Sequence, residues 1–518
     1  MRPFDAHGDF HPFAEGGELR RLAVRGGAAT ISAAALSLAV QVVSTVVLAR
    51  MLTPADFGVV AMVTTFALLL MSVGASGCTE AIIQPDKMDR FLASNLFWIN
   101  FAVGVILAAG FAASGSLLAR FYKNHLVTDI AIVLSPGILM ASVNVVQIGL
   151  LKRGMRFAGA SANDLISRIA NTVLTIVLAA RGWGYWALVL GLVAQCLSVA
   201  IGAWWLCRWI PSMPRRGVGT RGALKFAAHI YSTYNANYFT RNFDNFLVGW
   251  RFNAAALGYY KKAYDLFALS ATQLTAPLSH VALSALSRVK NDPARFRRQL
   301  VGSLEMVSLV GMAMGANLTL VGREVVQLIL GPKWVESGRI FELFGPGIGV
   351  MLLYSTVWWI HVSIGRPERW FRWTLIEAVV TGLMFVVALP WGPVGIAVAW
   401  SVSFWVLLIP AFWYAGRPID FGVSQLVTAA WRYALASLVA GTLSAIVLRH
   451  SAFSGTPGST LHTLDEIVVS SAVFLALYLG AVILLHWGIS PLRRLKSLLR
   501  ELAPMSRTEV LQVATREG

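Results

Sequence analysis

The feature that most constrains this chain is a series of long apolar stretches that recurs along nearly all of its 518 residues. A helix needs about 20 apolar residues to cross a hydrocarbon core of roughly 30 Å, and about fourteen stretches reach that length. The sequence therefore predicts an all-α polytopic membrane protein. The predicted spans cover residues 27–49, 57–77, 93–113, 127–150, 162–180, 185–207, 226–250, 264–286, 301–321, 343–364, 373–390, 393–414, 430–448 and 467–488.

Composition and charge agree with this class. The chain is 57% hydrophobic and 13% charged, yet it carries a formal net charge of +18. If the N-terminus is inside and the loops alternate, about 30 of the 43 lysines and arginines lie on the inner side and about 11 on the outer side. The bias predicts cytoplasmic termini. It also explains the basic excess by topology and anionic membrane lipids, without nucleic acid as a partner.

An internal repeat divides the chain. Residues 48–60 align with residues 248–260, at an offset of 200, and both segments follow a predicted span. An even number of spans separates the copies, which predicts a parallel repeat of two lobes. The expected organisation is a cytoplasmic tail (1–22), an N-lobe of six spans (23–210), a cytoplasmic linker (211–224), a C-lobe of six spans (225–415), two extra helices (416–490) and a cytoplasmic tail (491–518).

The seventh predicted span carries polar groups that lipid should reject. Asn237, Arg241 and Asp244 share one helix face, and Asn245 follows directly. The repeat-related positions on the first span are also polar: Ser37, Gln41 and Ser44. Matched stripes at one depth predict that both helices line a central cavity. The alternative is structural: Arg241 pairs with Asp244, and the asparagines join neighbouring helices.

A second acid–base pair, Asp164 and Arg168, lies at i, i+4 in the fifth predicted span. We include it among the cavity candidates, although a position near the cytoplasmic end would let both side chains reach the interface. Glu305 and Glu377 are further intramembrane acids whose role is left open. No metal site is expected, because the histidines lack ligand spacing and the three cysteines fall in or beside spans.

Enzyme chemistry finds little support in the sequence. The chain lacks a Gly-rich Lys-Ser/Thr loop for ATP and an Asp-x-Asp pair for a metal-bound sugar nucleotide. We therefore expect neither catalysis nor a cofactor. A polytopic membrane glycosyltransferase stays open as an alternative from another class.

Four stretches resemble one family. Residues 48–58, 242–264, 286–292 and 331–334 look like segments of the Wzx-type polysaccharide flippases, in the polysaccharide-transport branch of the MOP (multidrug/oligosaccharidyl-lipid/polysaccharide) exporter superfamily. The resemblance covers about 30–420. It implies two six-helix lobes in a MATE-like V shape plus two C-terminal helices. It also implies a flippase that moves polyprenyl-pyrophosphate-linked oligosaccharide across the bacterial cytoplasmic (inner) membrane for lipopolysaccharide or exopolysaccharide biosynthesis.

The resemblance gives the candidate residues a role. Arg241 would bind pyrophosphate through its planar fork, and a polysaccharide polymerase or chain-length protein would be a partner. One departure limits the transfer: the first span has Gln41 and no arginine, whereas the related lipid II flippases use several cavity arginines. Arg25 and Arg50 at the span ends are the other cations available. A MATE-like drug/cation antiporter is the alternative within the superfamily, and an arginine in the stripe argues against it.

The charge bias makes a topological prediction. Alkaline phosphatase fused after His462, in the last predicted outer loop, should be active because that loop faces the oxidising side. The same enzyme fused after Arg216 should be silent. Colony colour and enzyme activity report both fusions, and the reverse pattern would invert the predicted orientation.

Overall fold

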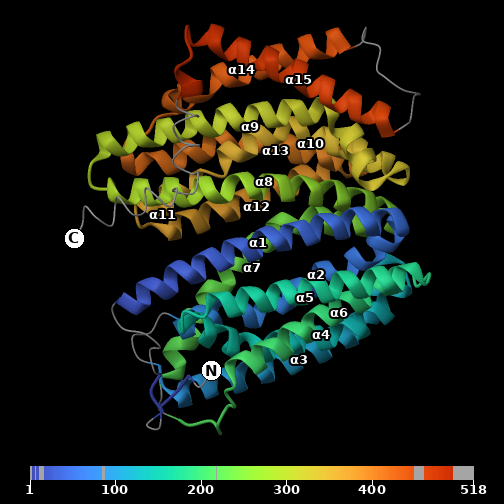
Figure 1. Ribbon diagram of the computed structural model, residues 1–518, viewed down its shortest axis with the longest axis vertical. Helices are drawn as coiled ribbons and strands as arrows, with labels where there is room; N and C mark the ends of the chain where they lie inside the picture. Colours follow the sequence, from blue (N-terminus) through green and yellow to red (C-terminus); the bar gives the residue numbers. More distant parts are fainter. Residues whose placement is uncertain are drawn as a thin grey trace. The chain divides into compact units, whose positions relative to one another are not determined.

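The computed structural model describes residues 3–5, 8–10, 17–83, 88–216, 219–448 and 460–493 (Figure 1). The prediction of an all-α protein is confirmed over this part of the chain. The α-helices are α1 (Gly17–Met51), α2 (Pro54–Ile83), α3 (Arg90–Tyr122), α4 (Leu126–Arg153), α5 (Phe157–Ala180), α6 (Tyr185–Cys207), α7 (Thr220–Arg251), α8 (Ala254–Arg288), α9 (Pro293–Leu330), α10 (Val335–Tyr354), α11 (Val357–Ser363), α12 (Pro367–Ala388), α13 (Gly392–Gly416), α14 (Val423–Leu448) and α15 (Thr460–Leu485). Short 3-10 turns are η1 (Pro332–Trp334), η2 (Leu389–Trp391) and η3 (Arg417–Ile419).

Each predicted span overlaps one long helix, except that the tenth is divided between α10 and α11 at Ser355 and Thr356. Within the described residues, ten segments are long and apolar enough to cross a membrane. Two helices begin earlier than predicted. Helix α7 begins at Thr220, inside the predicted linker (211–224), and α1 begins at Gly17, inside the predicted N-terminal tail (1–22). Three further long helices, α5, α7 and α8, are not among the ten. The number of helices that cross the membrane therefore stays a prediction.

The chain forms two compact units. The first contains Met1–Lys262, Ile329–Glu336 and Thr381–Ile396, and the second contains Ala263–Leu328, Ser337–Val380 and Ala397–Gly518. Helix α7 belongs to the first unit because it packs along α2, where the hydroxyl of Tyr238 donates a hydrogen bond to the carbonyl of Thr65 at 2.8 Å. These units cut the chain differently from the predicted lobes, whose boundaries stay a prediction.

The second unit is held by close helix packing and aromatic rings. Helices α9 and α10 approach through Gly311, Gly315, Gly345 and Gly349, where an added Cβ would lie within 3.3 Å of the facing backbone. Such small-xxx-small pairs let membrane helices maximise van der Waals contact. Trp400 then packs against aromatic rings from α8 and α10, with ring centroids 4.7–5.0 Å away. Helix α15 is attached by Tyr478, whose hydroxyl donates to the carbonyl of Leu309 at 2.8 Å.

In the first unit, the two repeat copies meet at a pair of glycines. A Cβ on Gly58 would overlap the carbonyl oxygen of Ala254 and lie 3.0 Å from the backbone nitrogen of Gly258. The relation is reciprocal, because a Cβ on Gly258 would overlap the carbonyl oxygen of Pro54. The first turns of α2 and α8 therefore touch backbone to backbone. The repeat seen in the sequence at an offset of 200 corresponds to this quasi-symmetric contact.

One buried indole packs against both repeat copies. Trp334 of η1 is 0% exposed, and its Nε1 donates to the carbonyl of Ala49 at 2.8 Å. Its ring meets Phe57 of the first copy and Tyr259 of the second nearly edge-on, with centroids 5.5 and 6.1 Å away. We call the layer formed by residues 48–60, 248–260 and 331–334 the closed layer. Under the predicted topology it lies at the outer end of the first unit.

The predicted cytoplasmic linker is fastened to α3. Asn95 receives a hydrogen bond from the backbone nitrogen of Arg215 at 2.9 Å and donates to the carbonyl of the same residue at 2.6 Å. Ser94 likewise accepts from the backbone nitrogen of Ser212 at 3.0 Å. The described part of the segment therefore follows α3 in a fixed register.

Substitution of the paired glycines tests the closed layer. Gly58→Ala or Gly258→Ala should lower the free energy of unfolding by about 1–3 kcal/mol, because the new methyl group overlaps backbone that cannot rotate away. Gly110→Ala in α3 is the matched control, since its Cβ would meet nothing within 4 Å. Thermal unfolding of purified protein measures all three. Equal stability of the three variants would contradict the close contact.

Candidate functional site

Helix α7 presents its arginine and its aspartate in different environments. Arg241 is exposed, and within the described chain it makes no ion pair or hydrogen bond. Asp244, one turn further along the same face, is only 1% exposed. The face of α7 that is open at Arg241 therefore becomes enclosed at Asp244, and Val248 on the next turn is 0% exposed.

Asp244 is satisfied by partners other than Arg241. Its carboxylate accepts a hydrogen bond from the hydroxyl of Tyr260 at 2.8 Å, and that tyrosine is itself 0% exposed. The other carboxylate oxygen accepts from the backbone nitrogen of Asn245 at 2.8 Å. In this structure Asp244 therefore bonds to Tyr260 and to the backbone of Asn245, and no ion pair with Arg241 is formed. Asp244 joins α7 to α8 inside the first unit, and Arg241 has no ion-pair partner among the described residues.

Two of the asparagines of α7 are bonded within their own helix. Asn235 and Asn242 donate to the carbonyls of Tyr231 and Tyr238, one turn back, at 2.8 and 2.9 Å. Asn245 is 1% exposed, and its side-chain amide has no hydrogen-bond partner among the described residues. It is thus enclosed and does not line an open surface in this conformation. The side chain of Asn237 lies outside the described residues.

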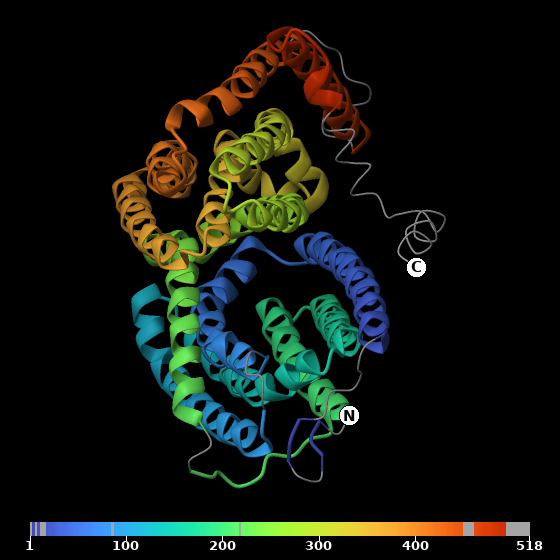
Figure 2. The same cartoon turned by 90° about the vertical axis from the view of Figure 1, so that its left-hand side faces the viewer.

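The repeat-related positions on α1 follow the same pattern of exposure. Gln41, which corresponds to Arg241, is exposed, whereas Leu48, which corresponds to Val248, is 6% exposed. Ser37 and Ser44 are half-buried. The two helices are not neighbours: α1 packs along α5 and α7 along α2, on opposite sides of the first unit (Figure 2). Whether they face one cavity stays a prediction.

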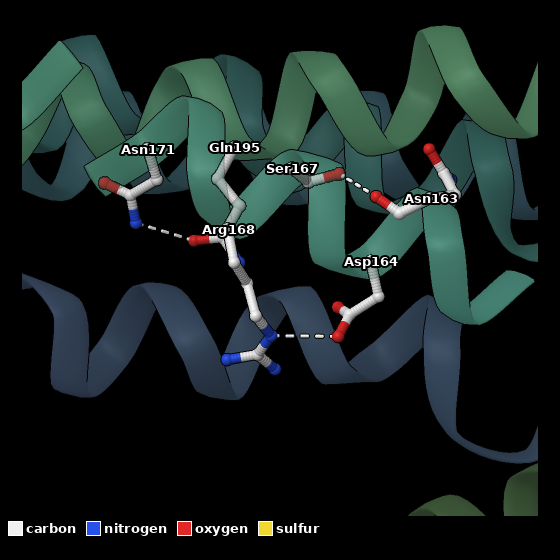
Figure 3. Close-up of polar contacts among 6 residues, drawn as sticks. All are labelled: Asn163, Asp164, Ser167, Arg168, Asn171 and Gln195. Carbon is white, nitrogen blue, oxygen red and sulfur yellow. Dashed lines mark hydrogen bonds and ion pairs between the residues drawn. The ribbon is translucent and has the colours of Figure 1, made fainter. Parts of the chain in front are cut away.

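On α5, the predicted acid–base pair is formed. Arg168 Nε lies 2.8 Å from a carboxylate oxygen of Asp164, and the two side chains are 41% and 51% exposed. Figure 3 shows both side chains on one side of the helix, joined by the ion pair. The pair is half-open on the surface of the first unit.

Sequence reasoning missed the polar contact between α5 and α6. Asn171 donates to the side chain of Gln195 at 2.8 Å (Figure 3). Asn163 donates to the carbonyl of Val199 at 3.1 Å. On α6, Gly191 and Gly202 leave room, since a Cβ on either would overlap these polar groups. The signal was available as Asn163, Ser167 and Asn171 at i, i+4, i+8. This contact fixes the rotation of α5 about its axis.

The candidate site is therefore a set of open polar positions on helices of the first unit. Exposed Gln41 and Arg241 lie about two turns from the closed layer on their helices, and the Asp164–Arg168 pair lies on α5. Arg241 can attract an anion, and the remaining groups can donate and accept hydrogen bonds. The described residues contain no cluster of metal-ligating side chains.

Comparison with solved structures defines the class of protein. The fold matches the lipid II flippase MurJ in an inward closed conformation, with a TM-score of 0.70 and 14% identity, over 89% of this chain and 100% of MurJ. It also matches a multidrug MATE transporter of the MOP superfamily in an inward-facing conformation, with a TM-score of 0.57 and 14% identity, over 74% of this chain and 94% of that one. The molecule is a multi-pass membrane protein with the MurJ/MATE fold.

Sequence comparison gives the family. Residues 47–339, more than half of the chain, match the polysaccharide biosynthesis protein family, and the chain belongs to it. It is 22% identical to the succinoglycan biosynthesis transport protein ExoT of Rhizobium meliloti, over 65% of this chain and 68% of that one. It is 23% identical to the teichuronic acid biosynthesis protein TuaB of Bacillus subtilis, over 65% and 69%. The lipopolysaccharide biosynthesis protein WzxC of Escherichia coli is 19% identical over 63% and 66%. The resemblance expected from the sequence is confirmed.

The two environments on α7 predict different effects on stability. Tyr260→Phe should lower the free energy of unfolding by about 1–3 kcal/mol, because it leaves the buried Asp244 carboxylate without its main donor. Arg241→Ala should change it by less than about 0.5 kcal/mol, since an exposed residue without a partner loses little. Thermal unfolding of the two variants beside wild type checks this. The opposite order would mean that Arg241 holds the helix in place.

Proposed function

We propose that this protein is a flippase for polyprenyl-pyrophosphate-linked oligosaccharides in the bacterial cytoplasmic membrane. Family membership and relatives named for succinoglycan, teichuronic acid and lipopolysaccharide biosynthesis support a role in surface polysaccharide assembly. The MurJ-like fold supports movement of a lipid-linked saccharide across a bilayer. The glycan would cross among polar groups, and the polyprenyl tail would stay in lipid. Both termini would be cytoplasmic, and a polymerase would receive the product on the outer side.

The observation that carries this proposal is the uncompensated charge of Arg241. A cation inside a membrane helix is costly, and it is retained where it meets water or an anionic ligand. Arg241 has no counter-ion among the described residues, and it lies one turn before the enclosed Asp244. A guanidinium in this setting suits bidentate hydrogen bonding to pyrophosphate, which also neutralises its charge.

The alternatives fit these residues less well. A drug/cation antiporter needs a negative site, whereas the acid on this face, Asp244, is buried and bonded to Tyr260. A glycosyltransferase needs an acidic, metal-binding or basic catalytic group beside its acceptor. Among the candidate positions described above, the exposed acid is Asp164, and it is already paired with Arg168. We therefore favour transport without covalent chemistry.

Substitution of Arg241 tests the proposal. Arg241→Ala should abolish surface polysaccharide in a strain that lacks the native gene, with normal protein in the membrane. Arg241→Lys should retain part of it, because lysine supplies the charge without the planar fork. The measurement is polysaccharide per cell, normalised to membrane-inserted protein. A wild-type amount of polysaccharide from Arg241→Ala would contradict the proposed contact between Arg241 and pyrophosphate.

The double variant Arg241→Ala with Asp244→Ala is the matched control. If the two residues neutralised each other, removing both would restore function, because an unpaired buried charge is the costly state. The hydrogen bond between Asp244 and Tyr260 leads us to expect no rescue. Restored polysaccharide in the double variant would show that Arg241 serves to neutralise Asp244 and does not bind substrate.

A further inference from the structure

The Asp164–Arg168 pair lies deeper in its helix than the sequence indicated. Helix α5 begins at Phe157 and has 24 residues, so Arg168 stands at its midpoint. Roughly 17 Å of helix extends on either side, at 1.5 Å per residue. This exceeds the reach of an arginine side chain, so Arg168 cannot extend to either end of the helix. Its exposure calls for a polar neighbour at mid-helix depth.

The pair also faces away from the apolar side of α5. Ile166, Val173 and Val177 are 62%, 55% and 42% exposed and share one helix face, which suits contact with lipid. Asp164 and Arg168 each stand two residues from Ile166, or about 200° around the helix axis. The exposed charged pair is therefore on the face opposite the exposed apolar side chains. Contact with lipid does not explain its exposure.

Helix α1 brings further polar groups beside the pair. Ser161 donates to the hydroxyl of Thr30 at 3.2 Å, across a sequence separation of 131 residues, and a Cβ on Gly26 would lie 3.6 Å from Phe157 at the same separation. The two helices therefore run parallel in this register. Its continuation sets Ser37 level with Arg168, and exposed Gln41 follows one turn later. A strip of hydroxyl, amide and ion-pair groups results.

The two arginines differ in charge balance. Arg168 is neutralised by Asp164 at 2.8 Å, so this strip is polar with no net charge. Such groups attract a pyrophosphate weakly, but they offer fixed donors and acceptors for sugar hydroxyls, each of which both donates and accepts. The Asn171–Gln195 contact fixes the presentation of the strip. Arg241 has the uncompensated charge that pyrophosphate requires.

We propose that Asp164 and Arg168, with Ser37 and Gln41, form a glycan-binding strip that selects the oligosaccharide, separate from the pyrophosphate contact at Arg241. This assignment rests on the proposed function. It assigns the glycan and the pyrophosphate of the substrate to two different sets of residues. Asp164 and Arg168 are specificity-determining residues: they distinguish one lipid-linked glycan from another. Arg241 recognises the pyrophosphate common to all of them.

Two probes separate the sugar from the pyrophosphate. Wild-type protein in nanodiscs is titrated with the lipid-linked oligosaccharide pool extracted from a strain lacking this gene, and with undecaprenyl pyrophosphate, which has no sugar. The variant Asp164→Asn with Arg168→Gln should lose about tenfold or more in affinity for the first probe, from the loss of several hydrogen bonds. It should keep its affinity for the second within about twofold. Arg241→Ala should lose affinity for both.

The single variant Gln41→Ala changes an exposed residue and leaves the ion pair intact. It should show a smaller loss of affinity, and only for the oligosaccharide pool. The matched control is Asp292→Asn with Arg295→Gln, which neutralises an exposed ion pair at the start of α9 with N···O 3.2 Å, and should bind both probes as wild type does. Equal loss of both probes, or loss of neither, in the Asp164→Asn with Arg168→Gln variant would overturn the glycan assignment alone. Wild-type protein that binds neither probe would overturn the proposed function, and this inference with it.

Discussion

The backbone contact between Gly58 and Gly258 is the constraint from which the described arrangement of the first unit follows. Because neither residue has a side chain, the first turns of α2 and α8 touch directly, and the two repeat copies meet without a spacer. The contact closes residues 48–60 and 248–260 around Trp334. On each preceding helix, α1 or α7, Leu48 or Val248 is buried, and the residue two turns earlier, Gln41 or Arg241, is exposed. An alternating-access transporter would have to part this layer to release substrate on that side.

Polar groups on α1 and α7 differ in their partners and in their exposure. Asn242 and Asp244 are bonded to their own helix or to the next one, so their desolvation is offset. Asn235 donates to its own helix, but its side-chain oxygen, like the side-chain amide of Asn245, is enclosed and has no partner among the described residues. Arg241 and Gln41 are open instead.

The sequence was sufficient to predict the helices, because each needs only a long apolar run. It was also sufficient to predict the repeat, because residues 48–60 and 248–260 keep the same pattern. It also identified the pair on α5, since i, i+4 spacing alone brings Asp164 to Arg168. It failed where the outcome depended on another helix. The spacing of Arg241 and Asp244 allowed a local ion pair, but Tyr260 competes for the carboxylate from α8. The contact of Asn171 with Gln195 likewise required the rotation of α6 to be known.

The distribution of charge gives a reason for keeping both kinds of arginine in one transporter. Under the proposed function, a lone guanidinium such as Arg241 would bind every pyrophosphate carrier equally, and so would provide affinity without selection. A neutral pair such as Asp164–Arg168 contributes little attraction at long range, because its two charges cancel. At short range it would disfavour a sugar that leaves the fixed donor or acceptor unpaired. The free-energy cost of an unpaired polar group exceeds the free energy gained from a matched hydrogen bond. Selection of the glycan can then change by substitution on α5 while the pyrophosphate contact on α7 stays the same.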